Sequence, residues 1–148
     1  MKWMALTLLC GLSLFGRAAS AQEMVPIPPL PHVDQSGPYL WGLGGHEIIL
    51  MKASADGHNP YERCAILDAR TVEILNRTQA PPLRASDIRV INQGGKGVIV
   101  VRKYYLCDVK PQDAKADGTS IAALSQKWGR SVRTTFPDIA PRGSRFGL

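Results

Sequence analysis

A histidine and a glutamate stand side by side in the first half of the chain, in the order that opens a zinc-protease motif. His46 and Glu47 match the start of H-E-x-x-H, in which two histidines on one helical face bind Zn²⁺ and the glutamate acts as general base. The fifth position here is Leu50, so the second metal ligand is missing. The sequence therefore predicts no metal centre of this kind.

The remaining histidines, His32 and His58, lie near proline- or glycine-rich segments. Together with Asp56 or Glu47 they provide ligand types that zinc and copper accept. Their spacing matches no metal-binding motif, so we interpret them as surface residues. We expect neither a bound metal nor a cofactor.

A glycine-rich run with one lysine, Gly94 to Gly97, is the closest approach to a phosphate-binding loop. Such a loop needs a longer glycine frame, a Lys-Ser/Thr pair and a following helix, whereas β-branched residues follow here. The run is typical of a hairpin turn, in which glycine adopts positive φ at low cost. The chain also has no G-x-S-x-G nucleophile motif. These patterns favour a non-enzymatic protein, with an enzyme as the alternative.

Aromatic and arginine side chains are the remaining candidates for a binding surface, because both types are enriched at interfaces. Two aromatics precede the first predicted strand, and an arginine and a tyrosine are expected to share one face of a central strand. Packing in the core is the alternative for these aromatics. Further arginines lie near the C-terminus. The predicted binding residues are Tyr39, Trp41, Arg102, Tyr104, Arg130, Arg133, Arg142 and Arg145.

The positive charge of the chain is concentrated near its C-terminus. The whole sequence carries a net charge of +6, and two of its basic residues, Lys2 and Arg17, lie in the first 21 positions. From Lys127 onward there are five basic residues and one acidic residue, Asp138. A basic tail on a near-neutral body predicts weak attraction to an acidic envelope polymer. An evenly basic surface, typical of a nucleic-acid-binding module, is not present.

The N-terminus has the pattern of a secretory signal peptide. Lys2 is followed by an apolar run from Trp3 to Phe15, and Ala19-Ser20-Ala21 is a small-x-small cleavage pattern. The run is shorter than the roughly 20 residues that a membrane span needs, and no later stretch is long and apolar enough. We predict that residues 1–21 are removed and that the protein is exported to the periplasm or the extracellular space.

After this cleavage two cysteines remain, Cys64 and Cys107. In an oxidising compartment two lone cysteines usually form a disulfide. In the chain-entropy model, closing a loop of this length stabilises the fold by roughly 4 kcal/mol. We therefore predict one disulfide, which joins the ends of two predicted strands.

The elements that must position these residues read mainly as strands. His46 to Ala53 predicts a first strand, and Ile88 to Asn92 with Val98 to Cys107 predicts a hairpin whose second strand is central. Residues 62–76 predict either a second hairpin, which we favour, or a helix, since they contain good helix formers and no glycine. Thr119 predicts the cap of one short helix that ends at Gly129.

These elements predict a mostly β fold, a small antiparallel sheet or open barrel of about five strands with one C-terminal helix. The expected organisation is a signal peptide (1–21), a Pro-rich extended linker (22–40), a β-rich globular domain (41–129) and a basic flexible tail (130–148). The expected function is an exported, non-enzymatic binding or envelope-assembly module. Its partner is a protein or an acidic polymer. A small secreted enzyme or enzyme inhibitor is the alternative.

Overall fold

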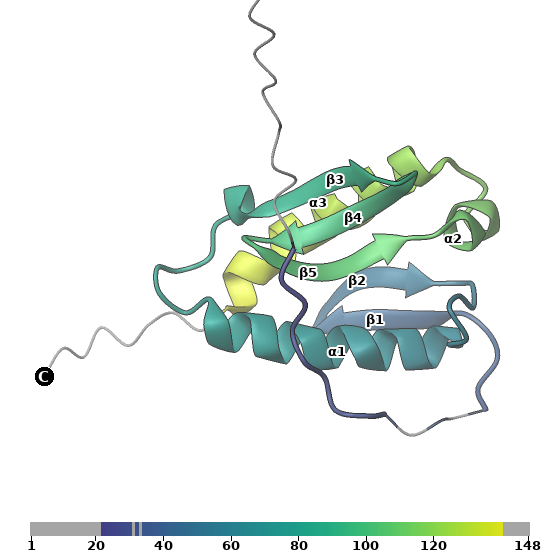
Figure 1. Ribbon diagram of the computed structural model, residues 1–148, viewed down its shortest axis with the longest axis horizontal. Coiled ribbons are helices and arrows are strands. Elements are labelled where there is room, and N and C mark those ends of the chain that lie inside the picture. Colours follow the sequence, from purple (N-terminus) through teal and green to yellow (C-terminus); the bar gives the residue numbers. More distant parts are fainter. Residues whose placement is uncertain (1–21, 31, 33, 141–148) are drawn as a thin grey trace, which may run out of the picture.

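Five strands form two separate antiparallel sheets in the computed structural model, which describes residues 22–140 except 31 and 33. The first sheet is a hairpin, and the second is a three-stranded meander with β4 in the centre (Figure 1). The hairpin strands are β1 (Tyr39–Leu43) and β2 (His46–Met51), and the meander strands are β3 (Ile88–Gln93), β4 (Lys96–Val101) and β5 (Tyr104–Val109).

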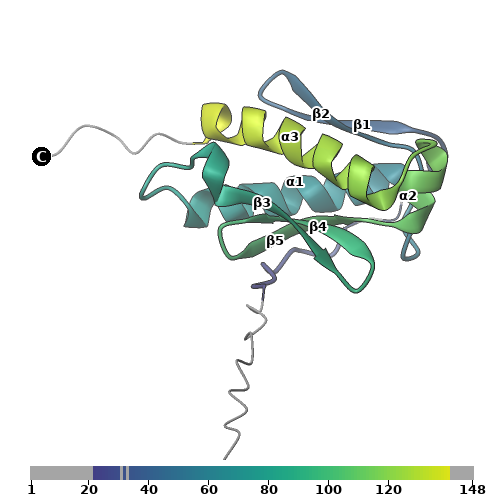
Figure 2. The ribbon, with the colours of Figure 1, turned by 90° about the horizontal axis from the view of Figure 1, so that it is seen from above.

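Helices contribute as much to the fold as the sheets do, which corrects the expectation of a mostly β protein. Two long helices, α1 (Pro60–Arg77) and α3 (Ile121–Ile139), pack on the sheets, with a short helix α2 (Pro111–Ala116) between β5 and α3. Viewed from above, α3 crosses the meander and reaches the hairpin (Figure 2). The two sheets therefore meet through side chains in a shared core and not through a common ladder.

Residues 62–76 form part of α1, so the predicted second hairpin is wrong and the helical alternative is correct. The N-cap is Asn59, whose side-chain oxygen accepts from the amide of Glu62 while the Glu62 carboxylate accepts from the amide of Asn59, both at 2.9 Å. Pro60 follows at the first helical position, where its missing N–H costs nothing. The buried residues Cys64, Leu67, Thr71 and Ile74 recur at helical spacing.

Gly129 does not end the C-terminal helix, which continues for three more turns to Ile139. A Cβ at Gly129 would collide with Cγ2 of Val90 on β3. Glycine is needed here because it lets the helix backbone approach the sheet, and not because the helix must stop. The N-cap is Ser120 rather than Thr119, with its hydroxyl accepting from the amide of Ala123 at 3.1 Å.

The predicted hairpin over residues 88–92 and 98–107 is correct in its first turn and wrong in its second strand. Gly94 and Gly95 form the turn between β3 and β4 with positive φ, as expected. The long second strand is in fact two strands, β4 and β5, which are joined by a tight turn at Arg102 and Lys103. Arg102 adopts a left-handed φ of 56° there, which an arginine rarely does.

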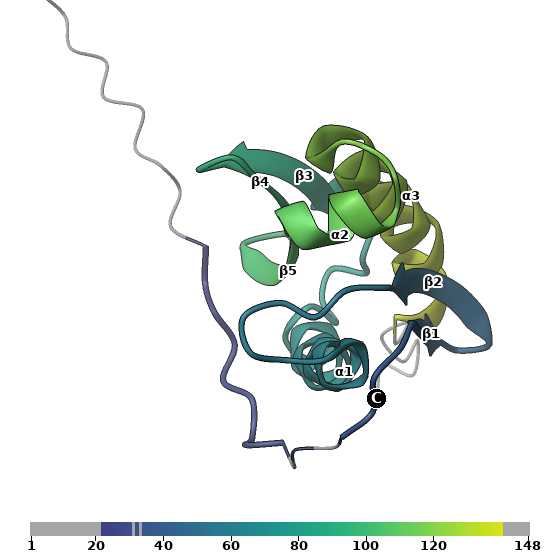
Figure 3. The same ribbon diagram turned by 90° about the vertical axis from the view of Figure 1, so that its right-hand side faces the viewer.

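The segment that follows the predicted cleavage site lies along the domain and is not a free spacer. Glu23 forms a parallel bridge beside Tyr104, with backbone bonds of 2.9 Å to the carbonyl of Lys103 and 3.1 Å from the amide of Tyr105. Val25 is buried in the core. Seen along α1, the segment descends beside β5 and passes around the helix to reach β1, which begins at Tyr39 (Figure 3).

The predicted disulfide is absent, because both cysteines are buried free thiols. Cys64 projects from α1, where its thiol lies 3.9 Å from the carbonyl oxygen of Tyr39, and Cys107 lies on β5. The prediction placed both residues at strand ends, but Cys64 is in the first turns of a helix. Its thiol is therefore part of the apolar face of that helix, in the role of a small hydrophobic residue.

None of the helices in the described part of the chain is both long and apolar enough to span a bilayer. The predicted signal peptide, residues 1–21, lies outside the described residues.

Candidate functional site

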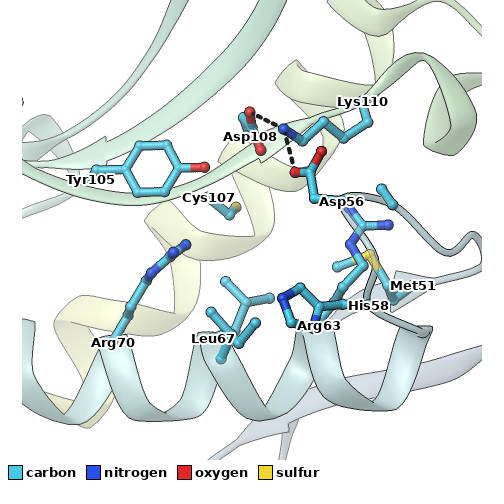
Figure 4. A pocket seen from close by; sticks show the side chains of 12 residues that line it. Met51, Asp56, His58, Arg63, Leu67, Arg70, Tyr105, Cys107, Asp108 and Lys110 are labelled. Atoms are coloured by element: carbon cyan, nitrogen blue, oxygen red, sulfur yellow. Dashed lines mark ion pairs between the residues drawn. The ribbon is translucent and has the colours of Figure 1, made fainter. Parts of the chain in front are cut away.

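A polar cleft of about 230 Å³ lies between α1 and β5 and is closed at one end by the loop that follows β2 (Figure 4). One wall of the cleft is the helix α1, and the other is β5, an edge strand of the meander. The helix α1 packs on the hairpin as well as on β5. The main polar and ionisable residues of the lining are Arg63 and Arg70 from α1, Tyr105, Cys107 and Asp108 from β5, Asp56 and His58 from the loop, and Lys110.

The loop presents its side chains through a two-residue turn. Ala55 and His58 exchange two backbone hydrogen bonds of 3.0 Å, and the intervening Asp56 and Gly57 both have positive φ. Asp-Gly favours this kind of turn, because both residue types tolerate the left-handed region. The turn places Asp56 and His58 at the mouth of the cleft.

Arg63 is fixed by a two-pronged ion pair. Its guanidinium nitrogens lie 2.6 and 2.7 Å from the two carboxylate oxygens of Asp113 on α2, and one of them also donates to the carbonyl of Ala53 at 2.5 Å. Both side chains are buried, at 10% and 1% exposure. Burial opposes the charge of Arg63, yet the hydrogen bond to Asp113 and its negative charge raise the pKa of the guanidinium. The guanidinium therefore stays charged, and its contact with Asp113 holds α1 against α2.

Lys110 bridges two carboxylates across the mouth of the cleft. Its ammonium lies 2.7 Å from Asp56 and 2.8 Å from Asp108. Burial lowers the pKa of Lys110, but the hydrogen bonds to Asp108 and Asp56 outweigh this effect, so the pKa is raised. The same contact lowers the pKa of Asp56. One ammonium thus faces two carboxylates at the mouth of the cleft.

Arg70 on α1 and Tyr105 on β5 meet across the cleft. The guanidinium carbon lies 4.8 Å from the centroid of the Tyr105 ring, within cation–π range. One terminal nitrogen donates to the carbonyl of Leu106 at 3.1 Å, whereas the buried Nε has no hydrogen-bond partner among the described residues. Arg70 is thus held in place by one wall while part of its donor capacity is unused.

Two further groups in the cleft stay protonated at neutral pH. Burial raises the pKa of the Cys107 thiol to about 12, and the charge of Asp108 acts in the same direction. Burial also raises the pKa of Tyr105, to which the nearby charge of Asp108 and a hydrogen bond with it add. Neither residue is ionised under physiological conditions, so neither serves as an anionic nucleophile.

A second, more apolar pocket of about 350 Å³ lies where the N-terminal segment passes over the start of α1. Ile27, Pro28 and Leu30 line one side of it, and His58 belongs to both pockets. His32 and His58 each place Nδ1 against the carboxylate of Glu62. Within the described part of the chain, no three His, Cys, Asp or Glu side chains are grouped as a metal ion would require.

The aromatic residues predicted to bind lie in or against the core. Trp41 is 1% exposed; its ring packs edge-on against Phe136, and its indole N–H donates to Asp68 at 2.7 Å. Tyr39 packs edge-to-face on Tyr61 with 5.1 Å between ring centroids. These contacts correspond to the core-packing alternative.

Arg102 and Tyr104 do not share a strand face, which corrects the prediction for this pair. Arg102 lies in the β4–β5 turn, where it pairs with Asp87 at 3.3 Å and donates to the carbonyl of Pro81 at 2.5 Å. Tyr104 begins β5 and is 8% exposed, with the ammonium of Lys103 5.2 Å from its ring centroid. Arg102 thus stabilises its own turn.

Two of the four arginines in the predicted tail lie in α3, and the other two lie outside the residues that the structure describes. Arg130 and Arg133 belong to α3, so residues 130–139 are not a loose tail. Arg130 is exposed, whereas Arg133 donates to the carbonyl of Ile88 at 3.0 Å. Arg142 and Arg145 lie outside the described residues. Binding of an acidic polymer by these arginines stays a prediction.

None of the predicted binding residues that the structure describes lines the cleft. If residues 60–77 are taken as a helix, the sequence indicates one wall of the cleft. Arg63, Leu67 and Arg70 then lie on the same face, whereas on a hairpin they do not. Asn59, Pro60 and Glu62 indicate that helix as a capping box with proline at the first position.

The protein is thus a small domain in which helices pack on two antiparallel sheets. Its polar cleft lies between the helix α1 and the edge strand β5. Residues 40–137 match a family described as a domain of unknown function, DUF8459, and the chain belongs to that family. The matched residues run from β1 into the last turn of α3 and include both walls of the cleft. No curated protein and no solved structure matches the chain.

Proposed function

We propose that this protein is an exported, non-enzymatic binding module whose ligand site is the cleft between α1 and β5. The contact that carries the proposal is Arg70 over the ring of Tyr105. An arginine and an aromatic side chain that meet in a cleft are typical of recognition sites. The ionisable groups around them support binding rather than turnover, because ion pairs fix Arg63 and Lys110, and Cys107 stays a neutral thiol.

The alternative of a small enzyme rests on the number of titratable groups that the cleft brings together. Catalytic acids and bases need pKa values near the working pH. In this cleft, burial moves the pKa values of Tyr105 and Cys107 away from neutrality, and pairing does the same for Lys110 and Asp56. This pattern favours a site whose charges are fixed.

A fragment screen tests the binding proposal. We expect small aromatic and aliphatic fragments to shift the backbone amide signals of the protein in NMR titrations, with the largest changes around Arg70, Tyr105 and Asp108. The fragments should leave the sample chemically unchanged. Shifts that map elsewhere would contradict the choice of site, and conversion of a fragment into a product would establish the enzymatic alternative.

Intact-mass measurement tests the export proposal together with the state of the cysteines. Protein recovered from the exporting compartment should begin at Gln22, as the Ala19-Ser20-Ala21 pattern predicts. After unfolding in iodoacetamide without reductant it should carry two alkyl groups, because Cys64 and Cys107 are free. Folded protein at pH 8 should stay unmodified, since burial raises both thiol pKa values to about 12. A mass that includes Met1, or no alkylation after unfolding, would contradict the respective expectation.

A further inference from the structure

Arg70 differs from the other cations of the cleft in having no carboxylate beside it. Arg63 pairs with Asp113, and Lys110 pairs with two aspartates. Among the described residues no carboxylate oxygen lies within ion-pair distance of the Arg70 guanidinium. The guanidinium of Arg70 therefore has no paired carboxylate, whereas Asp56 and Asp108 share the single ammonium of Lys110.

The position of this guanidinium is fixed before any ligand arrives. The guanidinium carbon lies 4.8 Å from the centroid of the Tyr105 ring, and one terminal nitrogen donates to the carbonyl of Leu106 at 3.1 Å. Figure 4 shows the side chain extending from α1 towards Tyr105. A buried donor without a partner, as at Nε, costs free energy. A negative charge placed against the guanidinium would offset part of that cost.

The rest of the lining limits the ligand to a single negative charge and an apolar body. Asp56 and Asp108 also face the cleft and would repel a dianion. Met51, Ile66 and Leu67 supply an aliphatic wall. The cleft has a volume of about 230 Å³, which equals the volume of roughly eight waters at about 30 Å³ each. A ligand of about eight non-hydrogen atoms has a comparable size.

We propose that the cleft binds a small monocarboxylate with an apolar body, and that Arg70 is the residue that recognises its carboxylate. This inference rests on the proposed function, because it names the ligand class of the same site. A guanidinium donates in a planar fork that matches the two oxygens of a carboxylate.

Benzoate and its neutral isostere benzamide are the probes that test the charge requirement on the unmodified protein. In NMR titrations followed through backbone amides, benzoate should shift signals around Arg70 and Tyr105 and bind at least tenfold more tightly than benzamide. Equal affinity for the two probes would overturn the inference. Phenyl phosphate at pH 8 carries two charges and should bind more weakly than benzoate; tighter binding would replace the carboxylate by a phosphate and overturn the assignment.

Variants at position 70 test which residue is responsible. Arg70→Gln should lower benzoate affinity at least tenfold, and Arg70→Lys should retain part of it as a point charge. Arg130→Gln, which removes an exposed arginine on α3, is the matched control and should bind like the parent. Unchanged affinity in a folded Arg70→Gln variant would overturn the role of Arg70. If Arg70→Gln does not fold, the comparison of benzoate with benzamide decides alone.

These outcomes separate the inference from the function on which it rests. Neutral fragments that bind in the cleft without any preference for carboxylates would refute the monocarboxylate while leaving a binding module. Absence of binding by every fragment, benzoate included, would refute both.

Discussion

Replacing Asp113 by asparagine should destabilise the protein by about 3–5 kcal/mol, the usual cost of leaving a buried charge without its partner. Asparagine has nearly the shape of aspartate but no charge, so Arg63 would remain buried and only partly bonded. Arg63 is 10% exposed and Asp113 is 1% exposed, which leaves water little access to compensate. Denaturant titration followed by tryptophan fluorescence measures the free energy of unfolding.

A second variant separates the loss of the charge pair from the loss of a helix cap. Asp113 also accepts from the amide of Lys110 at 2.9 Å at the start of α2. In an Arg63→Met background the unpaired charge is gone, so Asp113→Asn should cost much less there than in the parent. Asp138→Asn, on an exposed part of α3, is the control and should change stability by less than about 0.5 kcal/mol. A parent-like stability of Asp113→Asn would show that the buried pair contributes little.

Gly129→Ala is the second substitution with a large expected effect, and its sign is diagnostic. In the interior of an ordinary helix, alanine is about 1 kcal/mol more favourable than glycine. At this position the new methyl group would collide with Cγ2 of Val90, and overpacking of this kind costs typically about 1–3 kcal/mol. We expect a net loss of stability of up to about 2 kcal/mol after the gain in helix propensity is subtracted.

The neighbour of Gly129 supplies the control for this substitution. Val90→Ala removes the methyl group that the new Cβ would meet. Gly129→Ala should therefore cost less in the Val90→Ala background than in the parent, and the difference measures the contact itself. A Gly129→Ala protein that is more stable than the parent would mean that α3 does not approach β3 closely at this point.

The sequence was sufficient for the elements whose signals are local. The strand from His46 and the glycine turn at Gly94 and Gly95 follow from runs of apolar residues next to residues that tolerate positive φ. The turn at Arg102 has no such signal, because neither Arg102 nor Lys103 favours a left-handed backbone. Distant groups, Asp87 and Pro81 among them, stabilise this turn, and a linear pattern does not reveal such partners.

Two errors had the same physical origin, which is that one residue type serves two structural purposes. Asn59-Pro60 is typical of a loop, which suits a hairpin over residues 62–76, but Asn is also a strong N-cap and Pro is favoured at the first helical position. Gly129 was interpreted as a helix stop, but glycine also permits close approach of a helix to a sheet. In both cases the tertiary contact decides between the two purposes.

The candidate site was beyond the reach of the sequence for a related reason. The cleft needs α1 to lie across from β5, and this arrangement depends on how both elements pack against the hairpin and α3. Arg70 and Tyr105 carry no motif that joins them. Of the cleft residues, Asp56 and His58 have the side-chain types of metal ligands, and Cys107 was expected to form half of a disulfide. No pattern in the sequence assigns Arg70 a role. A correct prediction of the helix over residues 60–77 would have identified one wall of the cleft, but not the strand β5 that forms the opposite wall.

Arg63 and Arg70, which hold α1 to α2 and to β5 respectively, also contribute to the geometry of the cleft. They are seven residues apart on α1, or about 10 Å at 1.5 Å per residue. Because the two walls share no backbone ladder, these two contacts and the apolar packing set their separation. A ligand that enters between the arginines therefore meets a preorganised gap. The entropy lost in ordering that gap is part of the folding of the domain and not of the binding step.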